Sequence, residues 1–272
     1  MALPTEKIVS DWRRDGAACL RQVFDQAWLD LLEEGVETSR IAPSELSKDY
    51  AKDGEGSFFT DHAMHRRVPQ IRDFIANSPI AEIGARLLEA EKVNLIDDHL
   101  LVKEPGTANP TYWHQDQPYF NFVGEDYCSF WIPLDPVDET NGTLRFVIGS
   151  HLWKKEFKPV LIGKGEVVEQ ADKFDGLAPD IDGNPNDYET RTWDLTPGDC
   201  LAFHGKMLHG AYPNLSSGSP RRAISIRLTG DDIVWHPRQY APAESDQPGL
   251  TPGGPIDCED YPIVWPVDQQ TI

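Results

Sequence analysis

The sequence has few cysteines and no long apolar run, and each absence narrows what the chain can be. Its four cysteines lie far apart and form no Cys-x-x-Cys pair, which excludes a cysteine-based zinc or iron–sulfur site. It contains no apolar run of about 18 residues, and its first residues lack the apolar core of a secretory signal. We therefore expect a cytoplasmic protein with reduced thiols that does not cross a membrane.

Basic residues are also scarce. The chain has 25 Lys and Arg against 45 Asp and Glu, and the resulting net charge of −20 is spread along the sequence. Such a charge repels nucleic acid and anionic membranes, so we expect neither as a partner. It also disfavours a highly anionic substrate and leaves a small molecule as the expected partner. No feature of the sequence indicates an oligomeric state.

What the chain does contain favours one β-rich domain over residues 1–272. With 39% hydrophobic and 10% aromatic residues it can bury a full core, and 22 prolines and 21 glycines suit the many turns of such a fold. We find no internal repeat and no low-complexity linker. We expect an N-terminal helical part (1–91), a strand-rich core (92–230) with an insertion at about 152–189, and a tail (231–272) packed on the core.

Helical patterns come first along the chain. Asp15-Gly16 should end the first helix, Asp25 should cap the second, and residues 43–60 are predicted to form a loop. Apolar spacing predicts the helices over residues 4–14, 26–39, 68–76 and 79–90.

Short strands follow, separated by turn residues such as Asn141-Gly142 and Pro213-Asn214. Helices followed by a run of short strands indicate an antiparallel barrel or sandwich with a helical N-terminal layer. Besides an early strand at 17–23, we expect strands at residues 93–103, 112–116, 127–133, 143–148, 190–195, 200–203, 207–212 and 222–228.

The motif His114-Gln115-Asp116 is the strongest indication of chemistry. Residues two apart in a strand point the same way, so His114 and Asp116 can converge on one ion. Pro118 cannot donate to a ladder, and the strand should end there. Two imidazoles and one carboxylate can occupy one face of an Fe(II) ion and leave the other face open for small ligands.

Two downstream histidines, His204 and His209, compete for the third ligand position. Strand alternation gives them opposite parity, so one regular strand cannot direct both inward. His209 runs into a turn, and Arg221, twelve residues later, opens the next apolar strand. We expect Arg221 on the neighbouring strand of a hairpin, where it can bind a carboxylate of a dicarboxylic cosubstrate with two hydrogen bonds. This arrangement favours His209 as the ligand and a packed or supporting role for His204.

These residues, in this order, resemble the phytanoyl-CoA dioxygenase family of Fe(II)/2-oxoglutarate oxygenases. The resemblance runs along most of the chain and rests on the combination of motifs rather than on any one of them. The segments that carry it are Trp113-His114-Gln115-Asp116, Ser129-Phe130-Trp131, Asp138-Glu139-Thr140-Asn141-Gly142-Thr143-Leu144, Gly149-Ser150-His151, Pro197-Gly198-Asp199 and Arg221-Arg222-Ala223-Ile224-Ser225.

The resemblance implies a mainly β fold, a double-stranded β-helix (a cupin-like jelly roll), with the N-terminal helices packed on one sheet. It assigns His114, Asp116 and His209 to Fe(II), and it implies 2-oxoglutarate and O2 as cosubstrates. The implied activity is that of a dioxygenase that hydroxylates an unactivated C–H bond of a small metabolite and releases succinate and CO2. Because halogenating relatives carry a small residue where this chain has Asp116, the carboxylate favours hydroxylation.

The resemblance also suggests which residues hold 2-oxoglutarate. Arg221 matches the residue that binds its distal carboxylate, with the adjacent Arg222 as the rival. Trp131 matches a position beside the cosubstrate, and His99 and Lys103 lie on a strand that often lines that pocket. Each of these last three residues also fits a purely structural role.

One position departs from the family pattern. Members often carry a serine two residues after the second histidine, where its hydroxyl helps to hold 2-oxoglutarate, whereas this chain has Ala211. We expect another hydroxyl, such as that of Thr111 or Ser225, to take its place, or the cosubstrate to bind more weakly.

The substrate is less well defined than the reaction class. By position alone, Tyr119, Phe120, Trp235, Arg238 and Tyr240 are candidates for contacting it. The charge of −20 argues against a CoA thioester, which carries several phosphate charges. Two alternatives fit the same ligand set, a divalent-metal hydrolase or isomerase on the same barrel and a non-catalytic binding module. The presence of the arginine together with the complete ligand set argues against both.

Overall fold

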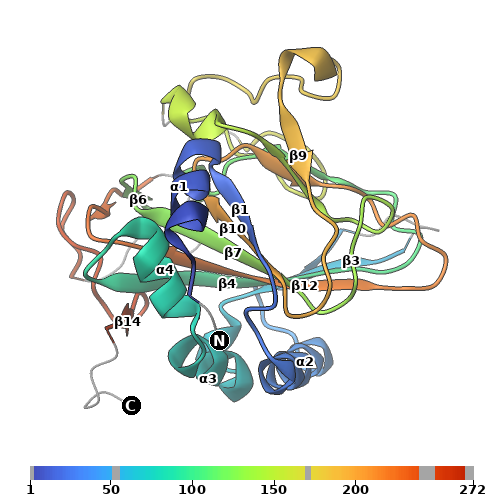
Figure 1. Cartoon of the computed structure of the whole chain (residues 1–272), viewed down its shortest axis with the longest axis horizontal. Helices are drawn as coiled ribbons and strands as arrows, with labels where there is room; N and C mark the ends of the chain where they lie inside the picture. The colour runs from blue at the N-terminus through green and yellow to red at the C-terminus, as the bar shows by residue number, and fades with distance from the viewer. Residues whose placement is uncertain (1–2, 51–55, 169–172, 239–248, 267–272) are drawn as a thin grey trace.

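The computed structural model describes residues 3–50, 56–168, 173–238 and 249–266, and it has a mainly β architecture (Figure 1). The α-helices of this part are α1 (Glu6–Asp15), α2 (Gln26–Ile41), α3 (Pro69–Asn77) and α4 (Ile80–Leu88). Short 3-10 helices are η1 (Met64–Arg66), η2 (Gln117–Tyr119), η3 (Ser150–Trp153) and η4 (Pro185–Asp187). The strands are β1 (Ala17–Leu20), β2 (Lys48–Asp49), β3 (Phe58–His62), β4 (Val93–Lys103), β5 (Thr111–His114), β6 (Phe122–Val123), β7 (Tyr127–Pro133), β8 (Leu144–Val147), β9 (Thr190–Thr192), β10 (Cys200–His204), β11 (His209–Ala211), β12 (Arg221–Thr229), β13 (Val234–Trp235) and β14 (Ile263–Trp265).

The four predicted helices are confirmed, with ends that differ by a few residues. Local capping interactions explain where the first two begin and where the first one ends. The Thr5 hydroxyl accepts a hydrogen bond from the backbone N–H of Ile8, and α1 ends at Gly16, whose φ of +82° favours glycine. The Asp25 carboxylate accepts from the backbone N–H of Trp28 and caps α2. No helix among the described ranges is both long enough and apolar enough to span a bilayer.

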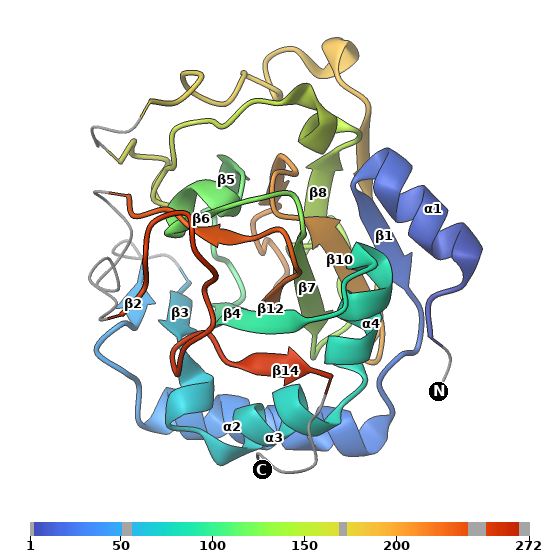
Figure 2. The same cartoon turned by 90° about the vertical axis from the view of Figure 1, so that its left-hand side faces the viewer.

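The strands form two antiparallel sheets that face each other. The large sheet has the order β1-β10-β7-β12-β4-β3-β2, with β14 also paired to β4, and the small sheet has the order β5-β11-β8-β9. A two-stranded ribbon joins β6 and β13. The helices lie along the outer face of the large sheet (Figures 1 and 2). The expected double-stranded β-helix with helices on one sheet is thus confirmed.

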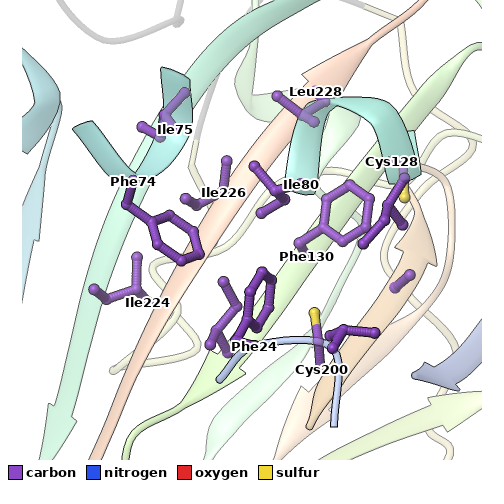
Figure 3. Close-up of a cluster of buried hydrophobic side chains, with 14 of the residues drawn as sticks. Phe24, Phe74, Ile75, Ile80, Cys128, Phe130, Cys200, Ile224, Ile226 and Leu228 are labelled. Atoms are coloured by element: carbon purple, nitrogen blue, oxygen red, sulfur yellow. The ribbon is translucent and has the colours of Figure 1, made fainter. Parts of the chain in front are cut away.

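Alternation along the central strands separates two cores. Ile224 and Ile226 of β12 face the helices, where they pack with Phe74, Ile80 and Phe130 (Figure 3). The intervening residues of the same strands face the small sheet, where a second core includes Trp131, Phe146, Phe203 and Ala223. Residues of β12 with the parity of Arg221 therefore point between the two sheets.

The C-terminal segment contacts the large sheet and the region beside it. β14 pairs with β4, and β13 pairs with β6. The rings of Trp235 and Tyr261 lie 6.3 Å apart in a small apolar cluster that also includes Phe122. Figure 2 shows β14 alongside β4.

Three expectations were wrong in detail. The predicted loop at residues 43–60 contains β2 and the start of β3, because Phe58 is fully buried and pairs with β4. β5 ends at His114 rather than at Pro118, because the chain turns into η2. β11 and β12 are not hairpin neighbours, since β11 belongs to the small sheet and β12 lies between β4 and β7 in the large one.

Candidate metal centre and cosubstrate cavity

A cavity of about 270 Å³ lies between the two sheets. His114 and His209 reach it from the small sheet, and Arg221, Ser225 and Arg227 reach it from β12 of the large sheet. The crossing of the chain from one sheet to the other after β11 explains why His209 and Arg221 meet across the cavity instead of side by side. This volume lies just below the usual ~300–1,000 Å³ of ligand pockets and suits small ligands.

Three side chains converge at the cavity wall. His114 ends β5 and is the cross-strand partner of His209 on β11, while Asp116 follows in a helical conformation just before η2. Nε2 of His114 and Nε2 of His209 lie 3.6 and 3.8 Å from the same Oδ1 of Asp116. One ligand atom from each residue lies within 4.8 Å of the other two, and all three residues are buried. This spacing is close enough to hold one metal ion.

Hydrogen bonds prepare both imidazoles for a metal. Nδ1 of His114 donates to the Tyr112 carbonyl at 2.8 Å, and Nδ1 of His209 donates to the Met207 carbonyl at 2.9 Å. A carbonyl oxygen can only accept, so each Nδ1 carries the proton and each Nε2 keeps its lone pair. Burial lowers the pKa of His209 to about 3, so this ring is neutral near neutral pH.

The carboxylate of Asp116 is held in a fixed orientation. Its Oδ2 accepts from the Ser129 hydroxyl at 2.6 Å and from Nε of Arg227 at 3.1 Å, and its Oδ1 accepts from Nη2 of Arg227 at 3.3 Å. Burial alone would raise the pKa of Asp116, but the charge of Arg227 and the interactions with His114 and His209 together outweigh burial and hold this pKa well below its ordinary value. The group is therefore ionised, as a metal ligand must be.

Arg227 was not predicted from the sequence. It also donates to Oδ2 of Asp97 at 3.0 Å, so one buried guanidinium holds two buried carboxylates. The signal that would have found it is parity, because Arg227 lies on the same face of β12 as Arg221 and Ser225.

Removing the Arg227 charge should destabilise the whole fold. In Arg227→Met the side-chain bulk remains, but Asp116 and Asp97 lose their buried cation. We expect the free energy of unfolding, measured by chemical denaturation of the metal-free protein, to fall by about 3–5 kcal/mol. Arg86→Met is the control, since it removes an ion pair to a Glu6 side chain that is 89% exposed and should cost under about 1 kcal/mol. Equal losses in the two variants would contradict this role for Arg227.

Arg221 is a buried cation without a carboxylate partner in the described part of the chain. It is 1% exposed, its Nη1 donates to the Leu101 carbonyl at 2.9 Å, and its Cζ lies 5.6 Å from the centre of the Trp131 ring. Its Nε has no hydrogen-bond partner within those same residues. Burial lowers the pKa of Arg221 to about 10, so the group still carries its charge at neutral pH. A buried, uncompensated cation beside a cavity is suited to bind an anion.

The other residues expected near 2-oxoglutarate divide into two groups. Trp131 and His99 line the cavity, and neither ring nitrogen of the buried His99 has a partner among the residues described. Lys103 is not part of the lining, and its Nζ donates to the Tyr212 carbonyl at 3.0 Å and lies 4.8 Å from the centre of the Phe58 ring. Arg222 faces the other way and pairs with Asp135 and Glu33.

The hydroxyl groups suggested as replacements for a serine at position 211 are both present at the cavity. Thr111 and Ser225 line it together with Ala211, and Thr111 is the cross-strand partner of Ala211. His204, the alternative candidate for the third ligand, does not line the cavity. Its Nδ1 accepts from the Lys206 backbone N–H, and its ring packs near that of His151.

The substrate candidates are not all brought together. Tyr119 and Phe120 line the cavity, and the Tyr119 hydroxyl exchanges hydrogen bonds with the backbone of Val160. Trp235 lies outside the lining, in the apolar cluster of the C-terminal segment. Arg238 also lies outside it and pairs with Glu156 at 3.1 Å. Tyr240 falls outside the described residues.

Comparison with known proteins agrees with this geometry. Residues 12–223 match the family Phytanoyl-CoA dioxygenase (PhyH). A probable phytanoyl-CoA dioxygenase of Caenorhabditis elegans is 27% identical over 224 residues, which cover 77% of this chain and 68% of that protein.

Two solved structures share the fold. The non-heme alpha ketoglutarate dependent carbocyclase SnoK from nogalamycin biosynthesis superposes with a TM-score of 0.75 at 20% identity and covers 96% of both chains. The epimerase SnoN in complex with Fe3+, alpha ketoglutarate (2-oxoglutarate) and nogalamycin RO gives 0.70 at 22% identity and covers 95% of this chain and 98% of that one. With the family match spanning most of its length, the chain belongs to the phytanoyl-CoA dioxygenase family of Fe(II)/2-oxoglutarate-dependent oxygenases.

Proposed function

We propose that this protein binds Fe(II) through His114, Asp116 and His209 and uses 2-oxoglutarate and O2 to hydroxylate an unactivated C–H bond of a small metabolite. Succinate and CO2 would be released with the hydroxylated product. The observation that carries the proposal is the combination, in one cavity, of the three converging ligand residues with the uncompensated buried cation of Arg221.

The residues around the ligands have defined tasks in this proposal. The Tyr112 and Met207 carbonyls fix the two imidazoles, and Ser129 and Arg227 fix the carboxylate of Asp116. When bound, iron together with 2-oxoglutarate and O2 supplies the oxidative chemistry that amino-acid side chains lack. The protein contributes orientation, a largely apolar wall that excludes water, and the charges that hold the cosubstrate.

For 2-oxoglutarate we assign the distal carboxylate to Arg221, with the ring of Trp131 beside it. His99 has unpartnered ring nitrogens at the cavity, and one of them can donate to a carboxylate of the cosubstrate. Lys103 is the cross-strand partner of Arg221, and its contacts favour a role in positioning that strand.

A divalent-metal hydrolase would use the same three ligands with zinc. Such an enzyme has no need of a buried, unpaired arginine next to the metal, so Arg221 favours the oxygenase.

The proposal is tested by admitting O2 to Fe(II)-loaded protein with 2-oxoglutarate and a panel of small molecules. We expect slow succinate formation without substrate, faster formation with one member of the panel, and a product that has gained one oxygen atom from labelled O2 by mass spectrometry. Succinate formation with a product that has gained no oxygen would retain the cosubstrate assignment and overturn hydroxylation. The absence of succinate despite bound iron would overturn both.

Restoring the family serine should strengthen cosubstrate binding. In Ala211→Ser, the new hydroxyl faces the cavity beside Thr111 and can donate to 2-oxoglutarate. We expect the Kd of 2-oxoglutarate, measured by calorimetry on the metal-loaded protein, to fall about 3- to 10-fold, as one net hydrogen bond would give. Ala202→Ser places a hydroxyl in the core under the helices, away from the cavity, and should leave this Kd unchanged. An unchanged Kd in Ala211→Ser would show that the position does not contact the cosubstrate.

A further inference from the structure

Part of the cavity wall carries polar atoms that the proposed iron and 2-oxoglutarate sites do not use. His62, the last residue of β3, and Asn121, which follows η2, both line the cavity. Neither residue belongs to the family motifs in the sequence. Their hydrogen bonds show which of their atoms are committed and which are available.

The ring of His62 is held in one orientation. Its Nδ1 lies 3.0 Å from Oδ2 of Asp97, and its ring stacks on that of His99 with centroids 3.7 Å apart and an interplanar angle of 19°. Burial alone would raise the pKa of Asp97, but His62 and Arg227 lower it below its ordinary value, so the carboxylate is ionised and can only accept. Nδ1 therefore carries a proton, and Nε2 lies on the other side of the ring. Within the described ranges, no residue hydrogen-bonds to Nε2.

Asn121 offers the complementary group. Its side chain is 1% exposed, and its Oδ1 accepts from the backbone N–H of Arg238 at 2.7 Å. Its Nδ2 has no acceptor anywhere in the described part of the chain. A buried donor without a partner is unfavourable, and a ligand oxygen at the cavity would relieve it.

Among the described residues, the rest of this wall is mainly apolar and holds no spare buried charge. The guanidinium of Arg227 is already paired with Asp97 and Asp116, and Lys48 is exposed at the rim. Within the described part of the wall, the phosphates of a CoA thioester would therefore find no buried cation besides Arg221, which the cosubstrate needs. Aromatic side chains in this lining favour a ring compound. The apolar and aromatic lining includes Leu46, Tyr119, Phe120, Leu161, Ile162 and Tyr261.

We propose that His62 and Asn121 determine substrate specificity by binding a neutral, largely apolar ring compound through two of its oxygen atoms. A hydroxyl of the compound, which can donate or accept, hydrogen-bonds to Nε2 of His62, and a carbonyl or hydroxyl oxygen accepts from Nδ2 of Asn121. This inference rests on the proposed function, because it names the substrate class of the same site.

The test measures binding rather than turnover. Calorimetry under argon on protein loaded with Fe(II) and 2-oxoglutarate would compare a hydroxytetralone with tetralone, which lacks the hydroxyl, and with tetrahydronaphthol, which lacks the ketone. We expect the hydroxytetralone to bind about 10- to 100-fold more tightly than either analogue, since a site built for a hydrogen-bonding group rejects ligands that lack it. His62→Leu should abolish the preference for the hydroxyl only. Asn121→Asp, which keeps the acceptor for Arg238, should abolish the preference for the ketone only.

A neighbouring residue supplies the matched control. Nδ1 of His65 pairs with Asp98 just as that of His62 pairs with Asp97, but His65 does not line the cavity. His65→Leu should therefore keep both preferences, and its loss of the hydroxyl preference would overturn the proposal by showing that the effect is structural. Equal affinities for the three compounds in the wild-type protein, or tighter binding of hexanoyl-CoA, would also overturn it. Succinate formation by the same wild-type preparation tests the proposed function separately, so the two failures are distinguishable.

Discussion

Asp116→Ala should abolish succinate formation and lower the Fe(II) affinity by more than about 100-fold. Changes to residues that only orient metal ligands already cost about 10- to 100-fold, and Asp116 is proposed as a ligand itself. Its Oδ1 lies 3.6 and 3.8 Å from the two Nε2 atoms, so the substitution removes the one anionic group of the three-residue cluster. Equilibrium dialysis with Fe(II), followed by a succinate assay, measures both effects.

Ser129→Ala is the matched control for this prediction. It removes the 2.6 Å hydrogen bond to Oδ2 of Asp116 but leaves the carboxylate and its contact with Arg227 in place. We expect a loss of metal affinity of at most about 100-fold. Asp116→Ala also leaves Arg227 with only Asp97, so the folded state of each variant is verified by thermal unfolding. Full activity in Asp116→Ala would refute the ligand assignment.

Arg221→Leu should raise the Kd of 2-oxoglutarate by about 30- to 1,000-fold, or about 2–4 kcal/mol, because it breaks a buried charge pair with the cosubstrate. The free energy of unfolding of the ligand-free protein should rise or stay the same. Arg221 is 1% exposed and, among the described residues, forms no ion pair with a carboxylate, so leucine removes a desolvated charge that only the Leu101 carbonyl and the Trp131 ring contact directly. Calorimetric titration of the metal-loaded protein and chemical denaturation of the ligand-free protein measure the two effects.

The adjacent arginine separates this effect from a general loss of positive charge. Arg222 points away from the cavity and pairs with Asp135 and Glu33. Arg222→Leu should weaken the fold but leave the Kd of 2-oxoglutarate within about 3-fold of the wild-type value, since charges outside the cavity are screened. A larger increase in Kd for Arg222→Leu than for Arg221→Leu would reverse the assignment.

Structural features that depend on residues close together in the sequence could be predicted from the sequence. The limits expected for β4 and β7 coincide with those in the structure, because breaks in the strand pattern mark their ends, such as Pro105-Gly106 after β4. Asp25 and Gly16 act at the ends of helices as predicted, since a side-chain acceptor and a left-handed residue exert their effects within one turn.

Features that depend on which sheet a strand joins could not be predicted in this way. Pro213-Asn214 indicates a turn, but a turn does not reveal whether the chain reverses within a sheet or crosses to the opposite one. The expected hairpin of β11 and β12 was wrong for this reason, although His209 and Arg221 still reach the same cavity.

In the candidate site, too, the residue types could be predicted from the sequence, whereas their tertiary arrangement could not. His114 and Asp116 converge as expected, but through a turn rather than through strand alternation, because Asp116 adopts a helical conformation. Arg227 was not predicted because the motif that carries the resemblance, Arg221-Arg222-Ala223-Ile224-Ser225, ends two residues before it. His62 was not predicted because its strand, β3, begins inside the predicted loop at 43–60, and its pairing with Asp97 is a tertiary contact.

The most direct test of the central claim is an anaerobic titration of the Fe(II)-loaded protein with 2-oxoglutarate, followed by visible absorption. Chelation of iron by a 2-oxo acid produces a metal-to-ligand charge-transfer band, so the signal requires both to occupy one site. We predict a saturable band in the wild-type protein, no band in Asp116→Ala, and a band in Arg221→Leu only at much higher 2-oxoglutarate concentrations. A wild-type protein that binds iron but gives no band, or an Arg221→Leu protein that titrates like the wild type, would contradict the account.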